Sequence, residues 1–234
     1  MKYKFLWLYF PVISMFTGMA NAGVVMTGTR VIFPSSAMEK TIQLKNPDAQ
    51  PYVVQLQMTD ESGKVDKNSL FSPVPPVFRM EPKTGQSVRL IFTGKGLPED
   101  KESVFYLDFT QLPSLKKSQQ EQNQLIIAIR NRVKVFYRPV SLEGTQSEAY
   151  RALNFSIVNG NFSVENPTGF YIPIREAKLL INGQSIQLAD NIMLSPKSKT
   201  PWHLSKKTTT LSGSRLQLIF VNDYGVDIKR ERVL

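Results

Sequence analysis

The most constraining feature of this sequence is a long alternating stretch near its middle, residues 125–139, LIIAIRNRVKVFYRP. Its odd positions are mostly apolar, and its even positions become largely cationic from Arg130 onward. A period of two is typical of a β-strand with one apolar and one charged face. The strand is longer than the usual strand of about five or six residues. Because its first half is apolar on both faces, the core of its own domain need not bury all of it.

Two interpretations of this strand are open. It can be a buried central strand, with its apolar residues packed in the core of its own sheet. It can also be an edge strand that stays long and apolar so that another chain pairs with it. The alternation alone does not separate the two.

The N-terminus has the composition of a secretory signal peptide. Two lysines precede an apolar run over residues 5–16, and the small residues Ala20 and Ala22 fit the pattern for signal peptidase. A membrane anchor is the alternative, but the run is short for a span and contains Pro11. We therefore expect residues 1–22 to be removed by cleavage after Ala22, and the mature protein to be exported and soluble.

The composition limits the partners and the chemistry. The formal net charge is +10, and loss of the two signal-peptide lysines lowers it by two to about +8. A basic protein can bind nucleic acid, but an exported protein rarely meets any, and no RNA-binding or helix-turn-helix pattern occurs. A patch for negatively charged partners and a merely solvated surface both stay open. The chain has no cysteine, so its stability must come from sizeable cores.

Residues 23–139 have the pattern of short strands separated by turn signals. Proline confines residues 73–82 to a sheet edge or a bulge. About seven strands at this spacing favour an immunoglobulin-like sandwich. The expected strands are residues 24–33, 40–45, 52–58, 87–92, 103–112 and 125–139.

The remainder of the chain has the same character. Asn159-Gly160 and Asn182-Gly183 are strong hairpin signals, and no convincing amphipathic helix occurs. The expected strands are residues 153–158, 161–165, 176–181, 185–188, 202–204, 216–221 and 227–233.

The alternation is lost over residues 140–148, so we place a domain boundary there. The sequence predicts an all-β protein with a signal peptide over residues 1–22. An N-terminal immunoglobulin-like domain follows over residues 23–143, and a C-terminal one over residues 144–234.

Residues with catalytic chemistry are scarce. His203 is the single histidine, and a metal site or a serine triad normally needs more imidazole than that. No Walker loop, dinucleotide fingerprint or G-x-S-x-G motif occurs. The carboxylate pairs Asp60-Glu61 and Glu99-Asp100 lie in turn-like surroundings, which favours solvated loops. We expect no enzymatic activity, cofactor, metal or small-molecule substrate.

Five segments together carry a resemblance to a known family. They are residues 29–33 (TRVIF), 75–82 (PPVFRMEP), 102–109 (ESVFYLDF), 134–139 (KVFYRP) and 222–225 (NDYG). In this order and spacing the chain resembles the periplasmic chaperones of the chaperone–usher pathway, which assemble bacterial pili. The resemblance covers essentially all of the mature chain. It implies two immunoglobulin-like domains at an angle, with a cleft between them, and a location in the periplasm.

The resemblance also implies the partners and the carboxylate site. The partners would be pilus subunits, which the chaperone supplies with a missing strand, and an outer-membrane usher, to which it passes them. Arg30 and Lys134 match the two basic residues that hold the C-terminal carboxylate of the subunit. The sequence leaves open whether the free protein covers its apolar edge by self-association.

Two further residue sets carry over from the family. Leu125, Ile127 and Ile129 match the alternating side chains that fill the open groove of a subunit. Because Lys134 has the opposite parity, a bulge or a strong twist is needed for it to share the cleft with them. An ionic cluster that fixes the angle between the domains is matched by Glu102, Arg138 and Asp223.

This chain departs from the family pattern at a few positions. Asp108 stands where asparagine is common, and Ser114 replaces a frequent second proline. The polar segment 114–123 is short, and the chain lacks cysteine. The last two features resemble the short-loop branch of the family.

Two other functions compete with this one. A pilus subunit or surface adhesin would also be exported and sandwich-like, but it would be expected to have an N-terminal donor extension and one incomplete domain. An exported hydrolase on a β scaffold would need catalytic partners that the sequence lacks.

Overall fold

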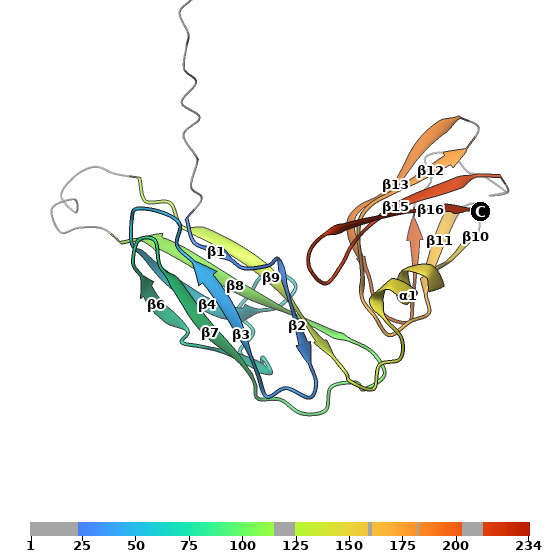
Figure 1. Ribbon diagram of the computed structural model, residues 1–234. Helices are drawn as coiled ribbons and strands as arrows, with labels where there is room; N and C mark the ends of the chain where they lie inside the picture. The colour runs from blue at the N-terminus through green and yellow to red at the C-terminus, as the bar shows by residue number, and fades with distance from the viewer. Residues whose placement is uncertain (1–22, 115–124, 159–160, 182, 203–212) are drawn as a thin grey trace, which may run out of the picture.

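The computed structural model describes residues 23–114, 125–158, 161–181, 183–202 and 213–234. Two β-sandwiches lie at an angle to each other, the N-terminal one built from β1 to β9 and the C-terminal one from β10 to β16 (Figure 1). Residues 1–22, which were predicted to be a signal peptide, lie outside the described residues, as do most of the polar segment before residue 125, His203, and residues 159–160 and 182 of the two predicted hairpin signals.

The N-terminal sandwich consists of a four-stranded and a five-stranded sheet. In spatial order the first sheet contains β1 (Val25–Met26), β3 (Glu39–Lys45), β7 (Gly85–Phe92) and β5 (Phe71–Val74). The second contains β2 (Arg30–Pro34), β9 (Ile129–Arg138), β8 (Ser103–Pro113), β4 (Tyr52–Thr59) and β6 (Val77–Met80).

Two of the predicted segments in this sandwich are each divided between its two sheets. The predicted first strand is split into β1 and β2, which belong to different sheets. Pro75 and Pro76 separate β5 from β6, and these two strands also lie in different sheets, each at an edge. Proline has no backbone N–H and therefore cannot donate a hydrogen bond to a neighbouring strand. This is why the segment lies at the edges of the sheets.

Aromatic rings fill one end of the N-terminal core. Phe33 is fully buried, and its ring centroid lies 5.0 Å from that of Phe71 in an edge-on arrangement. Phe71 in turn contacts Phe92 and Phe105, at centroid separations of 5.1 and 4.9 Å. Such pairs stabilise the core beyond the area they bury.

The C-terminal sandwich contains a three-stranded and a four-stranded sheet. The first contains β10 (Asn154–Val158), β11 (Asn161–Asn166) and β14 (Ser198–Trp202). The second contains β13 (Gln184–Leu194), β12 (Ile172–Ile181), β15 (Arg215–Val221) and β16 (Asp227–Val233). The rings of Phe162 and Trp202 stack in its core at 5.8 Å.

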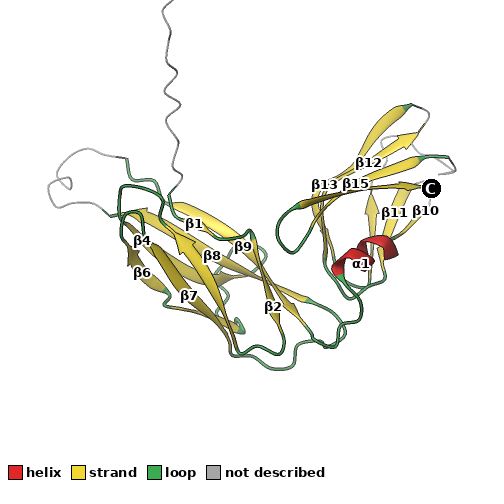
Figure 2. Cartoon of the chain, viewed as in Figure 1, coloured by secondary structure: helices red, strands yellow, loops and turns green. Residues whose placement is uncertain are grey.

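The prediction that the chain contains no helix is wrong at one place. Helix α1 (Gln146–Ala152) follows the N-terminal sandwich (Figure 2). Thr145 caps its first turn, and Glu148 bonds back to the Thr145 backbone in a capping box. Ala149 and Tyr150 bury its inner face. The T-x-x-E spacing of Thr145 and Glu148 was the sequence signal for a helix start. The helix itself is too short to show a clear helical period of apolar residues.

Strand lengths in the C-terminal sandwich also differ from the prediction. β12 and β13 extend well beyond the expected residues 176–181 and 185–188, and β14 ends where residues 202–204 were expected to begin a strand. The pairing of β12 with β13 shifts register between Ala177 and Lys178. Such a shift breaks the period of two on which the prediction relied.

The aromatic core gives a first testable prediction. Phe33→Ala should lower the free energy of unfolding of the N-terminal sandwich by about 3–5 kcal/mol, because it removes a fully buried ring. Val77→Ala is the control, because Val77 is 53 % exposed, and it should change little. Chemical denaturation of both variants measures the difference, and equal small losses would contradict the assigned core.

Candidate functional site

Strand β9 changes its environment along its length. Its last part, from Lys134 to Arg138, lies between β2, which runs parallel to it, and β8. Its first part, from Ile129 to Val133, pairs with β8 alone among the described strands. The two sequence interpretations therefore apply to different halves: β9 is central where it ends and an edge strand where it begins.

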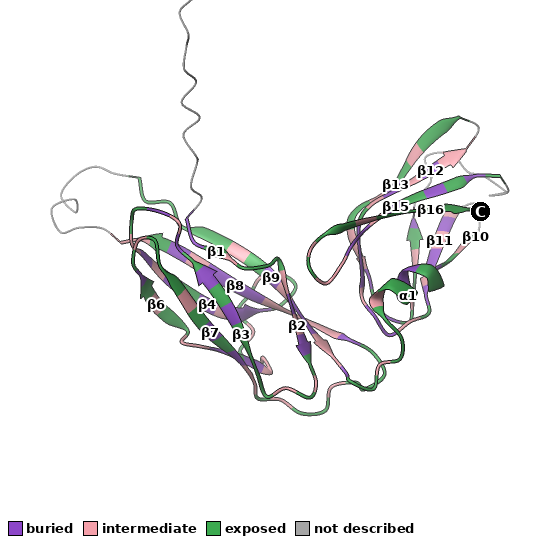
Figure 3. Ribbon diagram, in the orientation of Figure 1, coloured by how far each residue is buried: buried purple, intermediate pink, exposed green. Residues whose placement is uncertain are grey.

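Exposure of the odd-numbered side chains follows this change (Figure 3). Leu125, Ile127 and Ile129 are 86 %, 59 % and 45 % exposed, whereas Val133 and Val135 are 5 % and 0 % exposed. All five have the same parity, so parity alone cannot explain the difference. The chain enters β9 with a set of large apolar side chains that the described part of the protein leaves uncovered.

Of the two expected alternatives, a bulge or a strong twist, the bulge does not occur in the described ladder of β9 with β8. The ladder of β9 with β8 runs from Ile129↔Gln111 to Tyr137↔Ser103 without a register shift. Residues 125–128 precede the strand and are not paired in it. Any change of direction between Leu125 and Lys134 therefore comes from strand twist and from the unpaired lead-in segment.

Arg30 and Lys134 are direct partners across the parallel ladder of β2 and β9. Lys134 lines a cavity of about 520 Å³ whose walls come from both sandwiches, including Tyr106 from one and Asn191 from the other. Within the described residues, neither cation has a carboxylate in ion-pair distance. The guanidinium of Arg30 donates from one terminal nitrogen to the carbonyl of Val221, at 3.1 Å.

Partial burial disfavours the charged forms of both Lys134 and Arg30. Burial lowers the pKa of Lys134 below its ordinary value, the charge of Arg30 lowers it further, and Glu61 offsets only part of this. Burial also lowers the pKa of Arg30. The Nε atom of Arg30 is buried without a hydrogen-bond partner in the described protein. A buried donor without a partner destabilises the site, so an anion that reached it would be stabilised.

The three side chains of the predicted ionic cluster lie together. Arg138 Nε lies 2.6 Å from Glu102 Oε1, and the two terminal nitrogens of Arg138 donate to the Asp223 carboxylate at 2.7 and 2.9 Å. Glu102 and Arg138 belong to the N-terminal sandwich, and Asp223 lies in the β15–β16 turn of the other. The backbone N–H of Tyr171 donates to the second oxygen of Glu102 at 2.7 Å.

The cluster is strongly desolvated. Burial raises the pKa of the Glu102 carboxyl above its ordinary value, and the charge and hydrogen bond of Arg138 offset this only in part. Burial lowers the pKa of Arg138, but the hydrogen bond to Asp223 and the charges of both carboxylates outweigh it and raise this pKa. The buried Glu102 carboxylate and the Arg138 guanidinium are therefore tolerated in this site because they are paired.

Sequence reasoning missed several other contacts between the sandwiches. The backbone N–H of Glu102 donates to the carbonyl of Gly169 at 2.8 Å. A Cβ on Gly225 would overlap the hydroxyl of Thr29, so glycine permits the two sandwiches to approach closely there. No alternation or motif spacing predicts a contact between backbones so far apart in the chain.

Asp108 is a second missed feature. It is fully buried and pairs with Arg132 at 3.0 Å and with Arg130 at 3.4 Å, both on β9. Arg132 also donates to the carbonyl of Glu61 at 3.1 Å. The cationic face of β9 is thus partly neutralised by β8, and Lys134 is left as the cation that lines the cavity.

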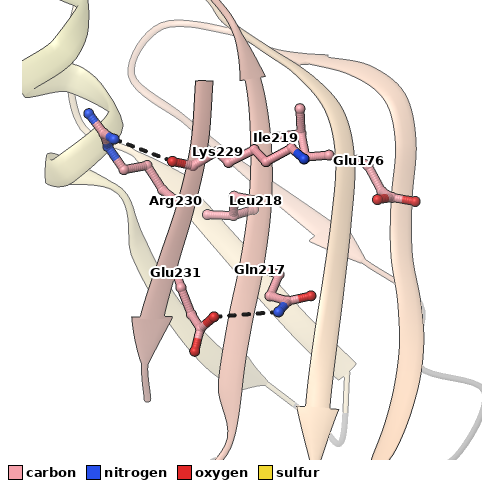
Figure 4. Close-up of a pocket in the computed structure, with 7 residues that line it drawn as sticks. All are labelled: Glu176, Gln217, Leu218, Ile219, Lys229, Arg230 and Glu231. Atoms are coloured by element: carbon pink, nitrogen blue, oxygen red, sulfur yellow. Dashed lines mark hydrogen bonds between the residues drawn. The ribbon is translucent and has the colours of Figure 1, made fainter. Parts of the chain in front are cut away.

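A further pocket lies on the outer face of the C-terminal sandwich, far from these residues in the chain. It has a volume of about 470 Å³ and includes Glu176, Gln217, Lys229 and Glu231 (Figure 4). Its charged side chains are solvated ones of both signs, which does not select a ligand. In the described ranges, no three His, Asp or Glu side chains are grouped as metal ligands. No described helix is long and apolar enough to cross a membrane.

Comparison with known families decides which of the competing interpretations holds. The model described as "Pili and flagellar-assembly chaperone, PapD N-terminal domain" matches residues 23–143. The model described as "Pili assembly chaperone PapD, C-terminal domain" matches residues 148–232. The chain belongs to the PapD-like family of pilus-assembly chaperones. Two immunoglobulin-like sandwiches are the architecture of this family, so the predicted fold class is confirmed.

Individual relatives agree with the family. The chain is 32 % identical to "Chaperone protein MrkB" of Klebsiella pneumoniae over 94 % of this chain and 95 % of that one. It is 33 % identical to "Chaperone protein HifB" of Haemophilus influenzae over 97 % of this chain and 93 % of that one. The crystal structure of the YadV chaperone, a protein of Escherichia coli K12, superposes with a TM-score of 0.77. The two sequences are 29 % identical, and the superposition covers 91 % of this chain and 100 % of the YadV chain.

Family membership removes the two competing functions. PapD-like proteins are periplasmic chaperones of pilus assembly and not enzymes, so the expected non-enzymatic function is confirmed. A hydrolase is thereby excluded. A pilus subunit or adhesin is excluded as well, because both halves of the chain match chaperone domains.

The ionic cluster gives a second testable prediction. Asp223→Asn should lower the free energy of unfolding by about 3 kcal/mol, at the lower end for a broken buried pair. The lower end of the range for buried pairs applies because the Asp223 side chain is still 25 % exposed to solvent. Thermal unfolding and the yield of folded protein measure the effect.

Asp227→Asn is the matched control for this variant. Asp227 also bonds an arginine, Arg175, close to the same turn, but both side chains are largely exposed. Its loss should cost well under about 1 kcal/mol. If the two variants were equally stable, the cluster would not stabilise the contact between the sandwiches.

Proposed function

We propose that this chain binds newly exported pilus subunits, completes their fold with the start of β9, and delivers them to an outer-membrane usher. The observation that carries the proposal is the uncovered apolar segment that leads into β9, next to two half-buried cations that lack a carboxylate in the described protein. A signal peptide cleaved after Ala22 would bring the protein to the periplasm, where such subunits arrive.

Leu125, Ile127 and Ile129 are proposed as the donor side chains. Transfer of one such side chain from water into an apolar groove contributes about 1.5–3 kcal/mol. Three of them could therefore dominate the apolar part of the binding free energy. The unpaired edge of β9 supplies backbone donors and acceptors, which fix the register of the added strand.

Arg30 and Lys134 are proposed as the site of the subunit's C-terminal carboxylate. Hydrogen bonds between a charged donor and a carboxylate contribute about 1.5–3 kcal/mol each. The buried Nε of Arg30 would gain a partner, and the lowered pKa of Lys134 would rise toward its ordinary value. The cluster of Glu102, Arg138 and Asp223 is proposed to hold the angle between the sandwiches, so that this site keeps its shape.

Two finer assignments are proposed as well. The boundary between the domains is proposed at residues 143 and 144, in the connection between β9 and α1. The chain is proposed to belong to the short-loop branch, because the polar segment 114–123 is short and the chain has no cysteine.

The donor assignment gives a third testable prediction. Ile127→Ser should leave the melting temperature of the free protein nearly unchanged, because the side chain is already 59 % exposed. Capture of subunits in the periplasm should be lost, and the subunits should aggregate or be degraded. Co-purification of subunits with the tagged chaperone measures the capture.

Val135→Ser is the matched control, because Val135 lies in β9, which the segment with Ile127 leads into, and has the same parity as Ile127. Val135 is fully buried, so this variant should lose several kcal/mol of stability, about 2–5 by analogy with large-to-small core changes. If Ile127→Ser destabilised the free protein in the same way, Ile127 would be a core residue and not a donor.

The carboxylate site gives a fourth testable prediction. Lys134→Ala and Arg30→Ala should each abolish subunit capture, with less loss of stability than Asp223→Asn, since each removes a half-buried cation that has no carboxylate partner in the described protein. Binding of a peptide that ends in the C-terminal sequence of a captured subunit reports the site directly. The same peptide with an amidated C-terminus should bind the wild type weakly.

The pH dependence of peptide binding follows from the lowered pKa of Lys134. Binding needs the protonated lysine, so the affinity should fall as the pH rises through this pKa, below the ordinary value for lysine. Lys134→Arg keeps its charge over this range, and its affinity should stay constant. Retained peptide binding by both alanine variants would refute the assignment.

A further inference from the structure

The tip of the β15–β16 hairpin, residues 222–226, presents two large apolar side chains to solvent. Tyr224 is 85 % exposed and Val226 is 56 % exposed. They are two residues apart on one short turn, and no ring contact involves Tyr224 within the described residues. The proposed function so far uses only Asp223 of this turn.

The backbone of this tip is held firmly, although its side chains are not packed. The Asn222 side-chain oxygen accepts from the N–H of Tyr224 at 3.0 Å and from that of Val226 at 2.9 Å. The N–H of Gly225 donates to the carbonyl of Asn222 at 2.9 Å. Gly225 has φ of +80°, which glycine adopts without strain. The turn therefore presents Tyr224 on a pre-organised backbone.

The tip is also fixed next to the cation pair. Asp223, which precedes Tyr224, bonds Arg138, and Gly225, which follows it, presses against Thr29. Thr29 is the neighbour of Arg30 in the chain. The hairpin reaches from the C-terminal sandwich toward β2 and β9 (Figure 1). Tyr224 thus lies between two residues that are both seated on the N-terminal sandwich, at the border of the carboxylate site.

We propose that Tyr224, supported by Val226, binds an apolar side chain among the last few residues of the subunit whose carboxylate reaches Arg30 and Lys134. This inference rests on the proposed function. A carboxylate held by two cations fixes the end of the subunit, so the side chains just before it lie within reach of the ring. A tyrosine offers a large contact area and has few rotatable bonds to order, which is why it is common at binding hot spots.

The same geometry makes Tyr224 a determinant of specificity. The carboxylate and backbone contacts are common to any subunit, because every chain has them. A ring beside them favours an apolar side chain near the C-terminus and disfavours a charged one, which would lose water without gaining a partner.

Site-specific photo-crosslinking in the full-length protein tests the contact. Tyr224→p-benzoylphenylalanine is irradiated in the periplasm of the native host, and the adducts are mapped by mass spectrometry. The expected adduct joins position 224 to the C-terminal peptide of a pilus subunit. The same substitution at Ile127 serves as the positive control, and at Met38, which is 74 % exposed, as the negative control.

The outcomes at the two positions are distinguishable. If position 127 crosslinks a subunit but position 224 does not, the inference about Tyr224 is wrong while the proposed function stands. If position 224 crosslinks the usher or an interior segment of the subunit, the inference is also wrong. If neither position crosslinks a subunit, the proposed function itself fails.

Affinity measurements test how much the Tyr224 ring contributes to the binding free energy. A peptide with the last residues of the crosslinked subunit should bind Tyr224→Ala about tenfold more weakly than wild type. Tyr224→Phe should bind within about twofold of wild type, because the contact needs the ring and not the hydroxyl. Both variants should melt as the wild type does. Unchanged affinity of Tyr224→Ala would overturn the proposal.

Discussion

One guanidinium bridges the two sandwiches. Arg138, at the end of β9, binds the buried carboxylate of Glu102 beside it and both oxygens of Asp223 in the other sandwich. Three charges in a largely buried site are tolerated only because they are paired and because Tyr171 and Gln146 satisfy further polar atoms. The pairing also sets a distance and a direction, since a guanidinium binds a carboxylate in one plane with two parallel bonds.

The same strand links this cluster to the binding site. Lys134 lies four residues before Arg138 on β9, and the unpaired edge lies just before Lys134. Along this segment the chain therefore passes from uncovered apolar side chains, past the cation Lys134, to the guanidinium that contacts the second sandwich. A tilt of the second sandwich would move the carbonyl of Val221 away from Arg30. The geometry of the cluster and of the carboxylate site are for this reason coupled.

Much of the fold could be predicted from the sequence because most strands have one buried face. β4 and β15, whose buried side chains alternate along the strand, were each predicted to within one residue. α1 was missed because seven residues with two buried side chains give no measurable period. In the site, the identities of the residues came from the family resemblance, whereas the alternation alone does not distinguish Ile129 from Val133. Both have the same parity and similar chemistry, and they differ only because β2 lies beside β9 from Lys134 onward. The pairing of β2 with β9 joins residues about a hundred positions apart, so a local sequence pattern does not reveal it.

The start of β2 also explains how side chains of opposite parity can serve one ligand without a bulge. The edge of β9 is open through Val133 and is closed at Lys134 by Arg30. A strand added along this edge must stop where β2 begins, so its end meets Arg30 and Lys134. If that end carries the carboxylate, the added strand runs from Leu125 toward Lys134 and is parallel to β9. The backbone of the added strand would pair with β9 in the plane of the sheet. The odd-numbered side chains of residues 125–129 would enter the groove of the subunit on one face of the sheet. Only the terminal carboxylate of the added strand would have to reach a side chain on the other face. The carboxylate would then fix the register, because a strand shifted by one residue would leave either the anion or the buried cations unpaired.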